Sequence, residues 1–181
     1  MTSAGQAREF LRNAEIICTA EEVQAAVARV ARDINAALAD QHPLVLSVMG
    51  GAVIFTGQLL PLLDFPLDFD YLHVTRYGSA QQGGALKWRV APGEKVSGRV
   101  VLVLDDILDE GETLAAVRKR VLELGAAACY CAVFADKATG KAKPLRADFT
   151  GVELPDRFVF GFGMDIEGAW RNLPAIYALK K

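Results

Sequence analysis

The most constraining feature of this chain is the segment from Val100 to Thr113, which reads V-V-L-V-L-D-D-I-L-D-E-G-E-T. Its first five residues are apolar, a run too short for a free-standing helix but typical of a strand buried on both faces of a parallel sheet. The run ends at Asp105 and Asp106, and a helical pattern begins near Thr113. Open α/β sheets bind ligands beyond the carboxyl ends of their strands, and helix N-termini hold phosphate. The segment therefore predicts an anion-binding crevice lined by carboxylates.

Length and composition set limits on the class of protein. The 181 residues predict one domain spanning residues 1–181, and 52% hydrophobic with 23% charged residues is ordinary for a soluble α/β protein. No apolar run reaches the roughly 18 residues that span a bilayer, and residues 1–13 lack an apolar signal core. We therefore expect a cytoplasmic protein without a membrane partner. The net charge of −2 gives no general electrostatic footprint for nucleic acid.

The cysteines and histidines do not indicate a metal or redox site. An odd number of cysteines, Cys18, Cys129 and Cys131, argues against a disulfide framework, and we interpret them as small buried residues. His42 and His73 are the only histidines, and neither lies in a catalytic motif or at zinc-ligand spacing from the cysteines. A serine–histidine triad and a zinc site are both disfavoured.

Helical and strand patterns alternate along the chain. Helices are predicted over residues 19–40 and 52–63 and from about 113 to 124. Strands are predicted over residues 44–49, 67–74, 100–104 and 128–135, with shorter ones over 86–91, near Phe149 and over 158–162. Residues 78–84 have no periodicity and predict a mobile loop. This order favours an α/β fold with a mostly parallel, twisted sheet flanked by helices.

The acidic residues and the turn after the strand suit a phosphorylated sugar. Adjacent carboxylates at Asp105 and Asp106 can accept hydrogen bonds from the two hydroxyls of a ribose or hold Mg²⁺ through water, although they can also be solvated loop acids. The turn from Asp109 to Thr113 presents successive N–H groups and a hydroxyl to an anion, and Gly111 permits a positive φ. The side chains of Glu110 and Glu112 must point outward, because carboxylates repel phosphate.

This arrangement resembles a known signature. An apolar strand, two acidic residues, two apolar residues and Asp-x-Gly-x-Thr resemble the phosphoribosyl-pyrophosphate motif of the type I phosphoribosyltransferases, in which the acidic pair is commonly Glu-Asp. The resemblance implies the type I fold, with a small hood formed by the N- and C-terminal segments. It also implies that residues 105–113 bind phosphoribosyl pyrophosphate, that Asp109 is the catalytic base at N7 of a purine, and that Mg²⁺ is the cofactor.

A second stretch resembles the purine pocket of the hypoxanthine-guanine phosphoribosyltransferases. Lys137 is followed further along the chain by Phe158-Val159 and then by Asp165, in the order found in that family. The resemblance implies that Lys137 donates to the purine 6-oxo group, that Phe158 stacks on the base and that the Val159 backbone contacts its edge. It implies that Asp165, with the acidic pair, helps to hold magnesium and pyrophosphate. Taken alone, Lys137 would be read as a solvated charge and Phe158 as a core residue.

Three shorter stretches extend the resemblance over residues 19–177. Val48-Met49-Gly50-Gly51 resembles the pyrophosphate loop, in which the family often has a non-proline cis peptide bond; whether the Val48–Met49 bond is cis stays open. Since many relatives have lysine where Met49 stands, only backbone contacts of this loop are implied. Residues 75–78, including Tyr77 and Gly78, resemble the start of the mobile active-site loop. Arg171, in W-R-N-L, matches the family arginine near pyrophosphate.

The resemblance implies purine salvage. The expected reaction transfers the 5-phosphoribosyl group of phosphoribosyl pyrophosphate to hypoxanthine or guanine, giving IMP or GMP and pyrophosphate, in a homodimer or homotetramer. Adenine is disfavoured, because the Lys137 ammonium has no acceptor for a 6-amino group. Two alternatives stay open: a phosphoribosyltransferase for another base such as xanthine, and a non-catalytic, phosphoribosyl-pyrophosphate-sensing regulator that binds RNA. The regulator would require a basic face.

Overall fold

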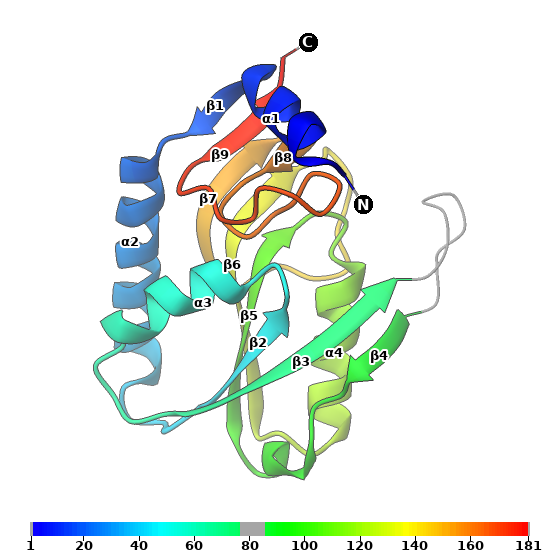
Figure 1. Ribbon diagram of the computed structural model, residues 1–181. Helices are drawn as coiled ribbons and strands as arrows, with labels where there is room; N and C mark the ends of the chain where they lie inside the picture. Colours follow the sequence, from blue (N-terminus) through cyan, green and yellow to red (C-terminus); the bar gives the residue numbers. More distant parts are fainter. Residues whose placement is uncertain (1, 77–85, 181) are drawn as a thin grey trace.

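A six-stranded sheet forms the centre of the computed structural model, which describes residues 2–76 and 86–180 (Figure 1). The strand order is β4-β3-β2-β5-β6-β7. Five strands are parallel, and β4 is antiparallel to β3. The strands are β2 (Leu44–Met49), β3 (Asp68–Arg76), β4 (Leu86–Val90), β5 (Val100–Leu108), β6 (Ala128–Ala138) and β7 (Phe149–Pro155). The predicted α/β fold with a mostly parallel sheet is confirmed.

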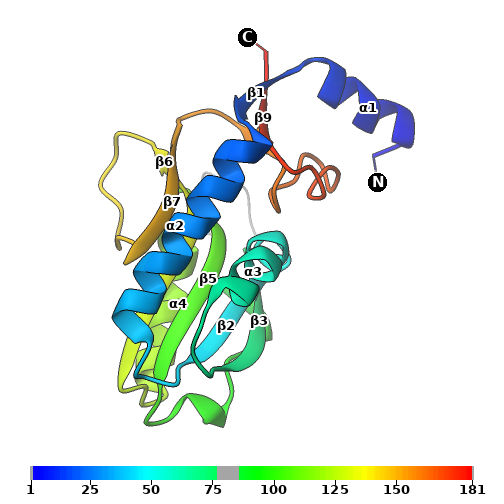
Figure 2. The ribbon, with the colours of Figure 1, turned by 90° about the vertical axis from the view of Figure 1, so that its left-hand side faces the viewer.

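Helices cover both faces of this sheet, as the alternation of side chains along β5 requires. Leu102 and Leu104 belong to a core cluster with residues of α2 (Ala20–Leu38) and α3 (Val53–Leu59). Val101 and Val103 point to the other face and pack with α4 (Glu112–Glu123). Two 3₁₀ turns, η1 (Leu60–Leu62) and η2 (Glu94–Val96), complete this part. Figure 2 shows α2 running along its face of the sheet.

Two central strands are longer than their apolar runs predict. We expected strands to end at residues 104 and 135, but the ladder between β5 and β6 continues to the pair Leu108↔Asp136, and β6 ends at Ala138. Backbone pairing continues because hydrogen bonding between strands does not require apolar side chains. Asp105, Asp106 and Lys137 therefore lie inside the last residues of strands, where their backbone is held in register.

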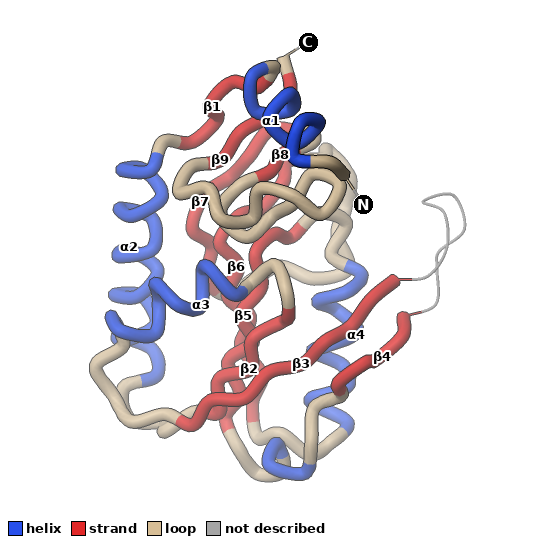
Figure 3. Tube along the Cα trace, viewed as in Figure 1, coloured by secondary structure: helices blue, strands red, loops and turns tan. Residues whose placement is uncertain are grey.

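A smaller unit covers the carboxyl ends of the main strands. It contains α1 (Ala4–Arg12) and an antiparallel sheet of β1 (Ala14–Cys18), β9 (Ile176–Leu179) and β8 (Val159–Phe160), in that order. Both chain termini lie at this end, and the long segment between β8 and β9 winds below α1 (Figure 3). This unit is the hood that the resemblance implied. None of the described helices is long and apolar enough to cross a membrane.

Candidate active site

A hollow of about 340 Å³ opens at the carboxyl ends of β2, β3 and β5. From β2 the chain continues to β3 and β4 on one side, and it then returns to β5 on the other side of β2. The hollow therefore lies at a topological switch point, where ligands of open α/β sheets bind. The residues that line it come from three strand ends, the start of α4 and the hood: Val48, Met49, Gly50, Gly51, His73, Val74, Thr75, Asp105, Asp106, Ile107, Thr113 and Arg171.

Asp105 and Asp106 give the hollow its chemistry. Asp105 is only 8% exposed, and its carboxylate accepts a hydrogen bond from the backbone N–H of Asp106 at 3.0 Å. Burial raises the pKa of Asp105 well above its usual range, and the neighbouring Asp106 charge adds to this effect. Burial also raises the pKa of Asp106, against the opposing charge of Arg171. A cation or a pair of hydroxyl donors in the hollow would stabilise the ionised carboxylates.

Two glycines let three segments meet at Asp106 without side chains between them. A Cβ atom on Gly51 would lie 1.9 Å from Oδ2 of Asp106. Gly163, in the hood, has a φ of 98°, and a Cβ atom there would lie 2.1 Å from the Gly51 carbonyl oxygen. The peptide bond between Met49 and Gly50, at the start of the same loop, is cis. The backbones of the pyrophosphate-loop candidate and the hood are thus in direct contact, and the loop backbone lies against the Asp106 side chain of β5.

The hood contributes a charged pair beside the hollow. The Arg171 guanidinium forms an ion pair with the Asp165 carboxylate and donates to the Gly163 carbonyl oxygen at 2.6 Å. The other oxygen of Asp165 accepts from the Gly168 backbone N–H at 2.7 Å. Asp165 itself is not among the residues that line the hollow, whereas Arg171 is.

The purine-side residues form a second group, outside the lining of the hollow. The Lys137 ammonium lies 2.6 Å from Oδ2 of Asp109, and the lysine side chain is only 11% exposed. Asp109 directly follows β5, and Lys137 lies at the end of the neighbouring strand β6. Phe158, directly before β8, is 60% exposed, which leaves its ring free for stacking, whereas Val159 is buried and paired with Ala178.

The turn residues and the metal ligands can be compared with the expectations. Glu110 and Glu112 are exposed, consistent with an outward orientation, and Gly111 has a φ of 84° at the start of α4.

Within residues 2–76 and 86–180, no group of three or more His, Cys, Asp or Glu could hold a metal ion alone. Mg²⁺ often binds through one or two carboxylates plus substrate oxygens and water. The carboxylate oxygens of the buried Asp105 and the half-buried Asp106 fit that mode.

Comparison with known proteins assigns the family. The family model described as "Phosphoribosyl transferase domain" matches residues 14–167. The chain belongs to the phosphoribosyl transferase family. A hypoxanthine-guanine phosphoribosyltransferase of Bacillus subtilis is 32% identical over 167 residues, covering 92% of this chain and 93% of the relative. The predicted family is confirmed.

Solved structures agree with the fold of this phosphoribosyltransferase. The crystal structure of a hypoxanthine phosphoribosyltransferase from Staphylococcus aureus superposes with a TM-score of 0.86 at 24% identity, covering 92% of this chain and 91% of that one. A hypoxanthine-guanine-xanthine phosphoribosyltransferase structure gives a TM-score of 0.78 at 27% identity, covering 92% and 97%. The type I fold is confirmed.

Some lining residues of this phosphoribosyltransferase, such as His73, were not assigned a role from the sequence. His73 lies in β3, where Met49 pairs with it in the parallel register, and Thr75, predicted at the start of the mobile active-site loop, is part of β3. The carboxyl ends of neighbouring parallel strands meet at one edge of a sheet. The end of the predicted strand over residues 67–74 could therefore have indicated that His73 lies at the site. Tyr77 and Gly78, expected in the mobile active-site loop, lie outside the described residues.

Proposed function

We propose that this protein is a purine-salvage enzyme that transfers the 5-phosphoribosyl group of phosphoribosyl pyrophosphate to hypoxanthine or guanine, releasing pyrophosphate. The observation that carries the proposal is the 2.6 Å pairing of Lys137 with Asp109 at the ends of β5 and β6. It brings a donor-only group and a candidate proton acceptor together just beyond the acidic pair of β5. The names of the relatives support the same substrates.

The hollow would bind the sugar and its leaving group. Asp105 and Asp106 accept hydrogen bonds from the ribose hydroxyls, and the N–H groups of the turn over residues 109–113 hold the 5-phosphate. Arg171 and the backbone of the Met49-Gly50-Gly51 loop lie on the pyrophosphate side. Asp105, Asp106 and Asp165 are the residues that would hold Mg²⁺, which would neutralise charge on the leaving pyrophosphate.

The purine side would orient the base and remove its proton. Lys137 exchanges Asp109 for the 6-oxo oxygen of the purine, which frees the Asp109 carboxylate to accept the proton from N7. Phe158 stacks on the ring, and the Val159 backbone contacts its edge. The protein thus contributes positioning and electrostatic stabilisation to a reaction in which charge separates at the anomeric carbon.

A base panel tests the proposal. Hypoxanthine, guanine, xanthine and adenine are each incubated with phosphoribosyl pyrophosphate and Mg²⁺, and pyrophosphate release is followed. We expect turnover of hypoxanthine and guanine and almost none of adenine. Asp109→Asn should slow the chemical step by about 10²- to 10⁴-fold, the usual contribution of a general base. Absence of pyrophosphate release with all four bases would refute the function, and single-turnover rates of the variant within threefold of wild type would remove Asp109 from the base role.

The assembly belongs to the same proposal. We expect a homodimer or homotetramer. Phe69 and Tyr71 share the outer face of β3, and Val90 of β4 is also exposed, which leaves apolar side chains available for a second copy. Sedimentation velocity of the purified protein measures the assembly directly.

A further inference from the structure

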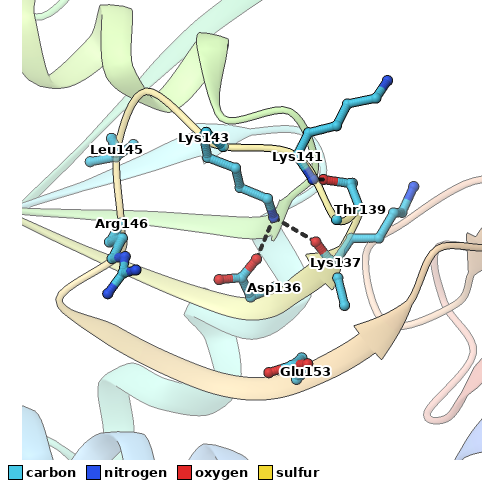
Figure 4. Close-up of a pocket in the computed structure, with 11 residues that line it drawn as sticks. Asp136, Lys137, Thr139, Lys141, Lys143, Leu145, Arg146 and Glu153 are labelled. Carbon is cyan, nitrogen blue, oxygen red and sulfur yellow. Dashed lines mark hydrogen bonds and ion pairs between the residues drawn. The ribbon is translucent and has the colours of Figure 1, made fainter.

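Lys143 is a nearly buried lysine that none of the expected roles uses. It lies in the segment between β6 and β7, and its side chain is 12% exposed. Its ammonium donates to the carbonyl oxygens of Leu108 and Lys137, each at 2.7 Å, and forms an ion pair with the Asp136 carboxylate. Figure 4 shows the contacts with Lys137 and Asp136. A lysine ammonium has three donors, and here all three have an oxygen partner.

The partners of Lys143 occupy a particular place in the sheet. Leu108 and Asp136 are the last registered pair between β5 and β6. Beyond this pair the backbone ladder no longer holds the two strands together, because β5 turns into α4 while β6 continues to Ala138. The ammonium of Lys143 bridges the strand ends at the point where the ladder stops.

The bridged carbonyls belong to the residues next to the chemistry. Leu108 directly precedes Asp109, and the second carbonyl is that of Lys137 itself. The two side chains are paired at 2.6 Å. Lys143 therefore bridges the residue before Asp109 and Lys137 itself. In the proposed function, the side chains of Asp109 and Lys137 contact different atoms of the same purine.

We propose that Lys143 is a positioning residue that fixes the spacing between Asp109 and Lys137, and through it the placement of the purine between proton acceptor and 6-oxo donor. The inference rests on the proposed function for its kinetic consequence. A misplacement of about 1 Å can reduce a rate by roughly 10²-fold. Loss of the bridge should therefore act on the base more strongly than on phosphoribosyl pyrophosphate, which the proposal places on Asp105 and Asp106 deeper in the strand.

The first test replaces the ammonium without shortening the side chain. In Lys143→Met, we expect kcat/KM for hypoxanthine to fall by about 10- to 100-fold, while KM for phosphoribosyl pyrophosphate changes by less than threefold. Lys141→Met is the matched control, since Lys141 is an exposed lysine of the same segment, and it should behave as wild type. A kcat/KM within threefold of wild type in Lys143→Met would overturn the proposal, as would an equal loss on both substrates.

A second variant separates the bridge from simple charge neutralisation. Lys143→Met leaves the Asp136 carboxylate without its cation, so the double variant Asp136→Asn/Lys143→Met removes that charge as well. We expect the double variant to stay as impaired as the single one, because the carbonyls of Leu108 and Lys137 still lack their donor. Recovery of wild-type kinetics in the double variant would assign the defect to the unpaired carboxylate and refute the positioning role.

Amide hydrogen exchange tests the bridge independently of turnover. We expect faster exchange over residues 107–112 and 137–142 in Lys143→Met, and unchanged exchange in Lys141→Met. Equal exchange in wild type and Lys143→Met would contradict the bridge even if the kinetics changed. If the wild-type protein transferred no phosphoribosyl group to any purine, the proposed function would fail by itself, and the exchange data would still decide whether Lys143 orders the two strand ends.

Discussion

At the scale of single residues, the proposed mechanism uses Lys137 to link base choice to catalysis, because its ammonium lies beside Asp109 and offers only donors. A site built around a required hydrogen bond can reject an analogue by about 10⁴-fold or more. Lys137→Ala should lose most activity with hypoxanthine but proportionally less with adenine, because a donor-to-donor contact also disappears. The expected result is a collapse of the hypoxanthine-to-adenine ratio of kcat/KM. Lys141→Ala is the control, and survival of the ratio in Lys137→Ala would mean that another group reads position 6.

Asp105 should lower the stability of the ligand-free protein. Burial and the adjacent Asp106 charge raise its pKa, so ionisation in the folded state costs free energy. Asp105→Asn keeps an acceptor for the Asp106 N–H and removes the charge. We expect the free energy of unfolding at neutral pH to rise by roughly 0.5–2 kcal/mol, the usual range for a single stabilising substitution. Activity with phosphoribosyl pyrophosphate should be lost in the same variant.

The pH dependence follows from the direction of this shift. The folded Asp105 keeps its proton to a higher pH than the unfolded chain, whose aspartates titrate near pH 3.9. Between the two pKa values the folded state binds more protons, so its contribution to stability is present at low pH and is lost as pH rises through the folded pKa. Denaturant titrations from about pH 4 upward should show this decline in wild type and a smaller one in Asp105→Asn. The exposed Asp64→Asn serves as control, and parallel wild-type and Asp105→Asn curves would contradict the argument.

The sequence was informative about residues for which we propose ligand contacts and silent about those whose partners are backbone atoms. Asp105 and Asp106 could be recognised because paired carboxylates after an apolar run have few structural uses. Lys143 could not, since two of its acceptors are carbonyl oxygens, which any residue provides. The contact depends on where the segment after β6 folds back, and no side-chain pattern encodes that position.

At the scale of elements, the two central strands were predicted in the right place but were predicted too short. Apolar runs mark the part of a strand that is covered on both faces, as in Val100–Leu104 of β5. They do not mark the part that continues toward the site, where Asp105, Asp106 and Lys137 replace apolar residues while pairing with a neighbouring strand persists. The functional ends of β5 and β6 are therefore the parts that hydrophobicity alone leaves out.

The junction of the β2 loop, β5 and the hood predicts a sharp steric effect. Gly51→Ala places a Cβ atom 1.9 Å from Asp106 Oδ2, so the carboxylate or the loop must move. Overpacking of this kind costs about 1–3 kcal/mol, and we expect the Kd for phosphoribosyl pyrophosphate with Mg²⁺ to rise at least tenfold by calorimetry. Gly57→Ala in α3 is the matched control: a Cβ atom there meets nothing within 4 Å, and alanine favours a helix. Wild-type affinity in Gly51→Ala would contradict the tight approach.

At the scale of the whole molecule, the hood was accessible only through the resemblance to a family. Its sheet pairs Ala14 with Leu179 and Val159 with Ala178, so its strands come from opposite ends of the chain. No local sequence pattern predicts pairing between strands so far apart in the chain. The helix α1 was likewise not predicted, although Ser3 and Gln6 form a capping box at its start.

The position of α1 gives the last prediction, because this helix has no buried residue and yet contacts the loop that carries Asp165 and Arg171. Thr2 Oγ1 donates to the Glu167 carbonyl oxygen at 3.0 Å, and Trp170 Nε1 donates to the Ala7 carbonyl oxygen. Deleting residues 2–12 should leave Tm nearly unchanged, since little apolar area is lost. It should raise KM for phosphoribosyl pyrophosphate by about 3- to 10-fold, equivalent to roughly one hydrogen bond.

Two variants separate the contact from the helix itself. Trp170→Phe keeps α1 and removes only the indole donor, so it should reproduce part of the increase in KM. Glu9→Ala, at an exposed position of α1, should have no effect. A deletion that lowers Tm strongly would show that α1 stabilises the fold as a whole, and an unchanged KM in both the deletion and Trp170→Phe would show that the hood loop keeps Arg171 in place without it. If KM rises while Tm does not, α1 acts on the pyrophosphate side of the site through this loop.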